Sequence, residues 1–131
     1  MRIKKLDHIG IRVADFERSI DFYRQFGFAT KRQNLDERVI ELQHPSGITL
    51  NLLDGANDDH GARNVLMDVT ARYPGYTHYA LNVELIEEAV IFMNKAGFTI
   101  TEGPVTFGNG NRSIFIRDPD LNVIEFTQIQ G

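Results

Sequence analysis

The amino-acid sequence predicts an α+β fold built from two βαβββ modules in tandem, with their sheets paired into a curved trough. Three observations support this fold. The chain has 131 residues, a length that suits one domain. An internal repeat with an offset of 70 residues places His8 on His78 and Val13 on Val83. Strand, helix, glycine and strand signals then follow in the same order in both halves, which is typical of duplicated modules.

The first module spans residues 1–53 and begins with a strand. Apolar and other side chains alternate from Asp7 to Val13, which predicts a strand with one buried face. Apolar residues then recur near helical spacing from Asp15 to Phe26, where Asp15 is suited to cap the helix and Gly27 to end it. Two β-type runs complete the module, Arg38 to Gln43 and Ile48 to Leu53.

The second module spans residues 76–131 and repeats this order. We expect a strand at Thr77 to Val83 and a helix at Leu85 to Ala96 that ends at Gly97. Two strands follow, at Asn111 to Arg117 and at Asn122 to Gln128. Residues 54–75 are rich in Asp, Asn, Gly and Arg, so we interpret them as a connector within a single domain, with a brief ordered stretch at Val65 to Met67.

The composition excludes several classes of function. The chain has 14 Lys and Arg against 18 Asp and Glu, and its basic residues are scattered, so we expect no nucleic-acid partner. It has no cysteine, which excludes disulfides, thiolate nucleophiles and cysteine-ligated metals. No run approaches the ~18 apolar residues of a membrane span, and no apolar leader follows the first basic residues. We therefore expect a cytoplasmic protein with no membrane partner.

Four polar residues at repeat-related strand positions converge on the predicted trough. His8 and His78 coincide at the offset of 70, and a later offset of 74 places Asn51 on Glu125. Apolar residues flank Asn51 and Glu125 on both sides, and one follows each histidine, so we expect the four polar side chains to take the face opposite to the helix. Two histidines and one carboxylate suit a divalent metal with open coordination positions, to which Asn51 would add a weaker oxygen.

Other polar motifs have simpler interpretations. We expect His44, in a turn before Pro45, and His60, in the connector, to be solvated. The glycines at 108–110 suit a turn, because no helix or lysine follows as in a phosphate loop. Asp118 to Asp120 likewise suits a turn rather than a pair of catalytic carboxylates. Ser19, Ser46 and Ser113 lack the context of a nucleophilic serine.

Five segments, DHIGIRV, DFYRQFGF, YTHYALNV, EGPV and RDPDLNVIEF, resemble the vicinal oxygen chelate superfamily over almost the whole chain. This superfamily includes glyoxalase I, extradiol dioxygenases, methylmalonyl-CoA epimerase, fosfomycin-resistance enzymes and bleomycin-binding proteins. The resemblance implies a homodimer and one divalent ion per site, either Ni, Zn, Mn or Fe(II). It also implies that His8, His78 and Glu125 are the metal ligands, and that the substrate chelates the metal through adjacent oxygens.

Departures from the individual families leave the reaction open. Asn51 stands where glyoxalase I has a glutamate, whereas Arg12 matches an arginine that contacts glutathione in those lyases. Gly55 and Pro74 stand where the lyases would supply Asn and Arg, so glutathione use stays open. Fosfomycin-resistance enzymes use only three protein ligands, but Phe115 stands where they have a phosphonate-binding tyrosine, and Gly10 where they have a threonine.

The leading hypothesis is a metal-dependent, glyoxalase-like lyase or isomerase acting on a small substrate. Glu125 would be both ligand and proton shuttle, while Arg12 would attract an anionic substrate tail and Asn51 and Phe115 would contact the substrate. The alternatives are a thiol transferase or hydrolase of the fosfomycin-resistance type and an Fe(II) extradiol dioxygenase. A fourth possibility, from a different class, is a non-catalytic antibiotic-binding protein of the bleomycin-resistance type.

Overall fold

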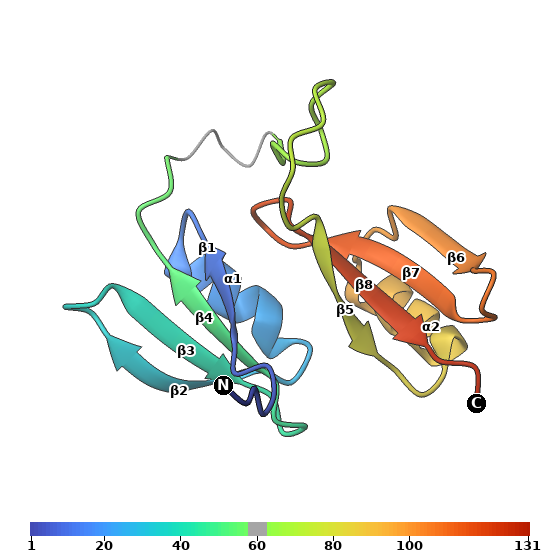
Figure 1. The fold of residues 1–131 in the computed structure, drawn as a ribbon, viewed down its shortest axis with the longest axis horizontal. Helices are drawn as coiled ribbons and strands as arrows, with labels where there is room; N and C mark the ends of the chain where they lie inside the picture. Colours follow the sequence, from blue (N-terminus) through green and yellow to red (C-terminus); the bar gives the residue numbers. More distant parts are fainter. Residues whose placement is uncertain (58–62) are drawn as a thin grey trace. The chain divides into compact units, whose positions relative to one another are not determined.

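A computed structural model of the protein describes residues 1–57 and 63–131. The chain forms two compact units, Met1–His60 and Gly61–Gly131, which contain module one and module two respectively. Each contains one four-stranded sheet and one helix in the order βαβββ, which confirms the predicted α+β class and tandem modules (Figure 1). The pairing of the two sheets into a trough stays a prediction.

Module one is a mixed sheet with a helix on one face. Its strand order is β1-β4-β3-β2, where β1 runs parallel to β4 and the other pairs are antiparallel. The elements are β1 (Ile9–Arg12), α1 (Phe16–Arg24), β2 (Ala29–Asn34), β3 (Val39–Gln43) and β4 (Thr49–Leu53). Alternate sheet residues such as Ile11, Leu42 and Leu52 are buried together with Ile20 and Tyr23 of α1, and this apolar cluster is the module's core.

Helix α1 begins as the sequence predicts. The Asp15 carboxylate accepts the Arg18 backbone N–H at 3.1 Å, which satisfies one of the unpaired donors of the first turn. The helix ends at Arg24, three residues before Gly27. Gly27 has φ of 94°, a left-handed conformation that glycine adopts without steric cost.

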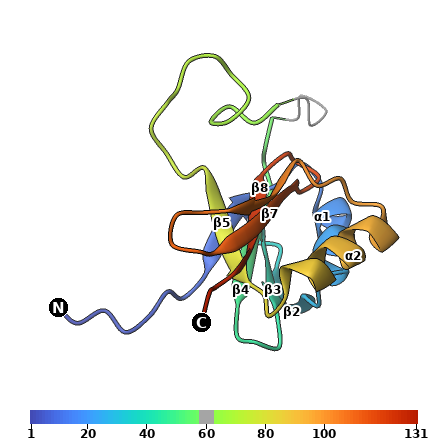
Figure 2. The same ribbon diagram turned by 90° about the vertical axis from the view of Figure 1, so that its right-hand side faces the viewer.

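Module two repeats the topology, with strand order β5-β8-β7-β6 and β5 parallel to β8. Its elements are β5 (His78–Asn82), α2 (Ile86–Ala96), β6 (Glu102–Thr106), β7 (Arg112–Arg117) and β8 (Val123–Gln128). Helix α2 packs against β7 and β8 (Figure 2). The Ile86 N–H at its start donates to Gln128 Oε1 at 2.8 Å, and Gly97 ends it with φ of 78°.

Two details differ from the sequence-based expectation. Strands β2 and β6 had no predicted residue ranges, although the βαβββ order required them. His8 was expected on a strand, but β1 begins at Ile9, because the ladder with β4 begins with the pair Ile9 and Leu50. His8 therefore lies one residue before β1, which is the edge strand of this sheet.

The predicted turns are confirmed where the chain is described. Asp118 is buried and accepts the backbone N–H groups of Asp120 and Asn122, each at 2.9 Å, so Asp118 to Asp120 is a turn. Residues 108–110 also form a turn, closed by the Gly110 N–H donating to the Phe107 carbonyl. In the described part of the chain, neither helix is long and apolar enough to cross a membrane.

The connector contains the short ordered stretch that its sequence predicts. Asn64 Oδ1 accepts the backbone N–H groups of Leu66 and Met67, which makes 65–67 a turn. Asp68 then accepts two hydrogen bonds from the Arg117 guanidinium, at 2.9 and 3.0 Å. Asp68, within the predicted connector, is thus attached to β7 of module two. His60, which was expected to be solvated, lies outside the described residues.

Candidate functional site

His78 and Glu125 meet on one face of the module-two sheet. They lie on the adjacent parallel strands β5 and β8, where Ala80 pairs with Glu125. Ile124 and Phe126 are buried on the helix side, so Glu125 projects from the opposite face, as the alternation predicts. His78 Nε2 lies 3.0 Å from Glu125 Oε2, and the side chains are 36% and 13% exposed. The pair is accessible but partly shielded from water.

Each member of this pair has a second polar partner. The hydroxyl of Thr77 lies 2.9 Å from His78 Nδ1, and Ser113 of β7 donates from its hydroxyl to Glu125 Oε1 at 2.7 Å. Because a carboxylate only accepts hydrogen bonds, the short His78 to Glu125 contact places a proton on His78 Nε2. When the ring is neutral, Nδ1 is then an acceptor and the Thr77 hydroxyl donates to it. A metal ion at Nε2 would displace this proton, and the neutral ring would then carry its proton on Nδ1.

Phe115 forms an apolar wall beside the pair. It lies on β7 directly opposite Glu125, and its ring meets the His78 ring edge to face with centroids 5.9 Å apart. Edge-to-face contacts of this kind are favourable and help to orient the imidazole. Phe115 was predicted to contact substrate, and its half-buried position beside His78 is compatible with that role.

His8 in module one is oriented by the residue before it. Its Nδ1 lies 2.8 Å from Asp7 Oδ2, which places the proton on Nδ1 and leaves the Nε2 lone pair available to a metal. The hydrogen bond from His8 also holds the pKa of Asp7 below its usual value. A carboxylate behind a histidine is the arrangement that metal-binding histidines commonly have.

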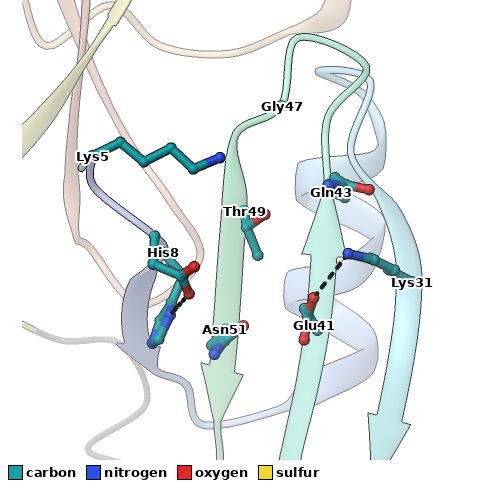
Figure 3. A pocket seen from close by; sticks show the side chains of 9 residues that line it. Lys5, His8, Lys31, Glu41, Gln43, Gly47, Thr49 and Asn51 are labelled. Atoms are coloured by element: carbon teal, nitrogen blue, oxygen red, sulfur yellow. Dashed lines mark hydrogen bonds and ion pairs between the residues drawn. The ribbon is translucent and has the colours of Figure 1, made fainter.

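His8 and Asn51 share a small polar pocket of about 180 Å³ (Figure 3). The pocket is lined by Lys5, Asp7, His8, Lys31, Glu41, Gln43, Gly47, Thr49 and Asn51. Asn51 Oδ1 is buried and lacks a hydrogen-bond donor among the described residues. An unpaired buried acceptor is costly, so this oxygen is suited to a ligand that supplies a donor or a positive charge.

The predicted metal ligands are therefore divided between the two modules. His78 and Glu125 come together in module two, while His8 and Asn51 come together in module one. Within residues 1–57 and 63–131, no group of three or more histidine, aspartate or glutamate side chains lies close enough to hold a metal. The donors present suit a divalent ion, since they are two oriented imidazoles, a fixed carboxylate and an unpaired amide oxygen. The three-ligand site itself stays a prediction.

Two other predicted residues lie apart from these contacts. Arg12 is exposed at the far end of β1 from His8, paired in register with Leu53, and is not among the residues that line the module-one pocket. His44 lies in the expected turn, where its Nδ1 accepts the Ser46 backbone N–H at 3.0 Å. Its ring also packs against Phe28, so it is half-buried rather than fully solvated.

Sequence reasoning missed the polar partners of the candidate ligands. Ser113 was considered only as a nucleophile, and Thr77, Asp7 and Glu41 were not singled out. Asp7 and Thr77 each directly precede a candidate histidine, and this shared position was a usable signal. Glu41 pairs in register with Asn51 and lies 3.6 Å from Lys31 Nζ, an arrangement that depends on the order of the strands.

A protein-family model described as Glyoxalase/Bleomycin resistance protein/Dioxygenase superfamily matches residues 5–126. A virulence protein of Salmonella typhimurium is 30% identical over 135 residues, which cover 98% of this chain and 86% of that protein. A glyoxalase domain-containing protein of Mycosarcoma maydis is 26% identical over 134 residues, covering 99% of this chain and 71% of that protein.

Solved structures also include similar proteins. The crystal structure of the Salmonella typhimurium virulence protein matches with a TM-score of 0.71 at 30% identity, covering 99% of this chain and all of that one. A bleomycin resistance determinant encoded on the transposon Tn5 matches with a TM-score of 0.72 at 16% identity, covering 98% of this chain and all of that one. At that level of identity, the similarity concerns the fold alone.

Proposed function

Because the chain belongs to the Glyoxalase/Bleomycin resistance protein/Dioxygenase superfamily, we propose that it is a divalent-metal-dependent, glyoxalase-like lyase or isomerase. Its substrate would be a small molecule with two neighbouring oxygens. The observation that carries this proposal is the His78 and Glu125 pair, 3.0 Å apart on adjacent strands, with the carboxylate held by a buried hydroxyl. A histidine and a carboxylate arranged in this way supply two of the three ligands expected for such a metal.

His8, His78 and Glu125 are the proposed ligands. His8 would bind through Nε2, because Asp7 occupies its Nδ1. His78 would also bind through Nε2, the atom that contacts Glu125 in this structure. The metal would supply Lewis acidity, which polarises a coordinated carbonyl or hydroxyl oxygen.

The remaining roles belong to the chain's own side chains. Glu125, whose Oε1 accepts the Ser113 hydroxyl, is also the proposed proton acceptor and donor. Asn51 Oδ1 would accept a hydrogen bond from a substrate hydroxyl, which would satisfy its unpaired acceptor. Phe115 would shield the reacting group from water, and Arg12 would attract an anionic substrate tail.

The polar pocket in module one favours an enzyme over an antibiotic-binding protein. Its lining includes two lysines, two carboxylates, a histidine and two amides, and no aromatic or aliphatic side chain. Stacking of a large aromatic antibiotic would need several aromatic side chains, and this pocket supplies none, although Phe115 of module two lies beside His78. A purely binding role would also not require the oriented nitrogen of His8 or the paired His78 and Glu125.

The direct test is metal binding by a His78→Ala variant. Removing one of three ligands should lower the affinity for Zn²⁺ or Co²⁺ by at least about tenfold, because Asn51 is too weak a ligand to compensate. His44→Ala is the matched control, since His44 lies outside the proposed ligand set and should bind metal like the unchanged protein. Unchanged calorimetric titrations for His78→Ala would rule out the assignment.

Elemental analysis of protein purified without chelator or metal-affinity steps distinguishes the possible reactions. We expect nickel or zinc at about one ion per chain for the lyase. Iron would instead favour a ring-cleaving dioxygenase, and manganese a transferase of the fosfomycin-resistance type. A protein that neither contains nor takes up a divalent ion would favour the non-catalytic binding role.

A further inference from the structure

We infer that Ser113 is a positioning residue that holds Glu125 so that only Oε2 is available to the metal and the substrate. The inference rests on the proposed function, in which Glu125 is a metal ligand. Ser113 would not contact the metal or the substrate. Its effect would act through the orientation of the carboxylate.

The geometry around Ser113 is that of a dedicated hydrogen bond. Ser113 lies on the central strand β7, two residues from Phe115, which pairs directly with Glu125. Its side chain is completely buried, and its hydroxyl donates to Glu125 Oε1 at 2.7 Å. A buried hydroxyl without a partner would be destabilising, so this contact satisfies both groups.

Module one provides an internal comparison. The offset that places Asn51 on Glu125 places Val39 on Ser113, and Val39 and Ser113 have corresponding positions in the two ladders. Valine has no hydrogen to donate. In this module the equivalent oxygen, Asn51 Oδ1, is buried and unpaired among the described residues. The fold therefore tolerates an apolar residue at this strand position, as Val39 shows. The serine occurs in the module whose neighbouring strand carries the carboxylate of Glu125.

The hydrogen bond has a consequence for coordination. A carboxylate with both oxygens free can bind a cation through one or both of them. With Oε1 engaged by Ser113, Glu125 would bind through Oε2 alone, which leaves one more coordination position open. A substrate that chelates through two adjacent oxygens requires two open positions, so Ser113 would favour that mode of binding.

Ser113→Ala tests the inference with Co²⁺, by calorimetry and by visible absorption spectroscopy. Loss of the positioning hydrogen bond should lower Co²⁺ affinity about 10- to 100-fold. Glu125 should then bind through both oxygens, and the higher coordination number should weaken the cobalt absorption band. Ser113→Thr retains the hydroxyl and suits a strand, so it should restore both the affinity and the band.

Ser19→Ala is the matched control, because Ser19 is also completely buried but lies in α1 of the other module. It should leave Co²⁺ affinity and the absorption band unchanged. Unfolding transitions of every variant report whether folding is retained, and Ser113→Val, which carries the residue that module one has at this position, replaces the alanine variant if that one does not fold. A folded Ser113→Thr as defective as Ser113→Ala would overturn the positioning role.

Glu125→Ala distinguishes a wrong role for Ser113 from a wrong metal site. If it abolishes Co²⁺ binding while Ser113→Ala changes neither affinity nor spectrum, Glu125 is a ligand and the role of Ser113 is wrong. If Glu125→Ala binds Co²⁺ like the unchanged protein, the proposed metal site itself is wrong, and the inference for Ser113 is refuted with it.

Discussion

Asn51 and Glu125 occupy equivalent places in the two modules but differ in charge. Both lie on the strand that pairs in parallel with the first strand of their module, opposite Gly10 and Ala80 respectively. The neutral amide donates less charge to a cation than a carboxylate does. The proposed site therefore carries one negative charge fewer than a site with a glutamate at both positions.

Replacing Asn51 with Glu should tighten metal binding. The strand already directs this side chain into the pocket that contains His8, and a carboxylate would add an anionic ligand there. We expect at least about a tenfold gain in Zn²⁺ affinity by calorimetry, with lower turnover of the native substrate because an open coordination position is filled. Asn51→Gln, of the same length as Glu but neutral, is the control. Equal affinity for both variants would mean that Asn51 does not face the metal.

At the scale of single residues, the sequence predicted the candidate metal ligands but not the side chains that hydrogen-bond to them. His8, His78, Asn51 and Glu125 followed from the repeat, because duplicated modules place equivalent residues at equivalent positions. Ser113 could not be found in this way, since its role depends on its place beside Glu125 in the β7 and β8 ladder. That register is set by strand pairing across the sheet and cannot be read from local alternation.

At the scale of elements, the start of α2 depends on a distant strand. Its N-cap residue, Leu85, has no side chain that can accept a hydrogen bond, and Gln128 of β8 accepts the Ile86 N–H instead. Gln128→Ala should therefore lower the free energy of unfolding by about 1 kcal/mol, as for the loss of a local cap. Chemical denaturation measures this, with Gln33→Ala on the exposed strand β2 as the control. Equal losses in both variants would contradict a capping role.

The two strands without predicted residue ranges, β2 and β6, lack the usual sequence signals of a strand. Strand β2 reads ATKRQN and is almost entirely exposed, so it has no apolar face to produce alternation. Strand β6 reads EGPVT, and both glycine and proline are unfavourable in strands. Each is stabilised mainly by pairing with its neighbour and shows a register irregularity there. The strands whose ranges were predicted carry apolar residues at alternate positions, which are buried in β3, β4, β7 and β8 and half-buried in β5.

The segment at 64–68 should give module two a pH-dependent stability. Two hydrogen bonds from Arg117, together with the Asn64 N–H, hold the pKa of Asp68 below its usual 3.8. A lowered carboxyl pKa stabilises the fold above the unfolded-state value, and this stabilisation is lost as the pH falls through the folded-state value. Asp68→Asn should thus be less stable than the unchanged protein at pH 7, by about 1 kcal/mol or less.

The difference between the two proteins should begin to shrink below about pH 3.8, where Asp68 of the unfolded chain takes up a proton, and should be lost as the pH falls further through the lowered folded-state value. Thermal or urea unfolding across pH 3 to 7 measures it, and Asp36→Asn in an exposed turn is the control. A constant difference over the whole range would show that the charge of Asp68 does not contribute.

At the scale of the whole molecule, each module is a small unit with an edge strand near its candidate ligands. Strand β1 ends the first sheet and follows His8, and β5 ends the second sheet and begins at His78. Edge strands present unpaired backbone groups that can pair with another strand. We therefore expect two copies of the chain to associate through these edges, and sedimentation equilibrium should give twice the mass of one chain. A monomer at micromolar concentration would contradict this.

If association pairs module one of one chain with module two of the other, each site takes His8 from one protomer and His78 with Glu125 from its partner. Mixing His8→Ala with His78→Ala chains tests this arrangement. In a mixed dimer, one site would then contain all three ligands and the other would lack both histidines. After full exchange about a quarter of the metal sites should be restored, because half of the dimers are mixed. If each site were built within a single chain, every site would still lack one histidine, and mixing would restore no metal sites.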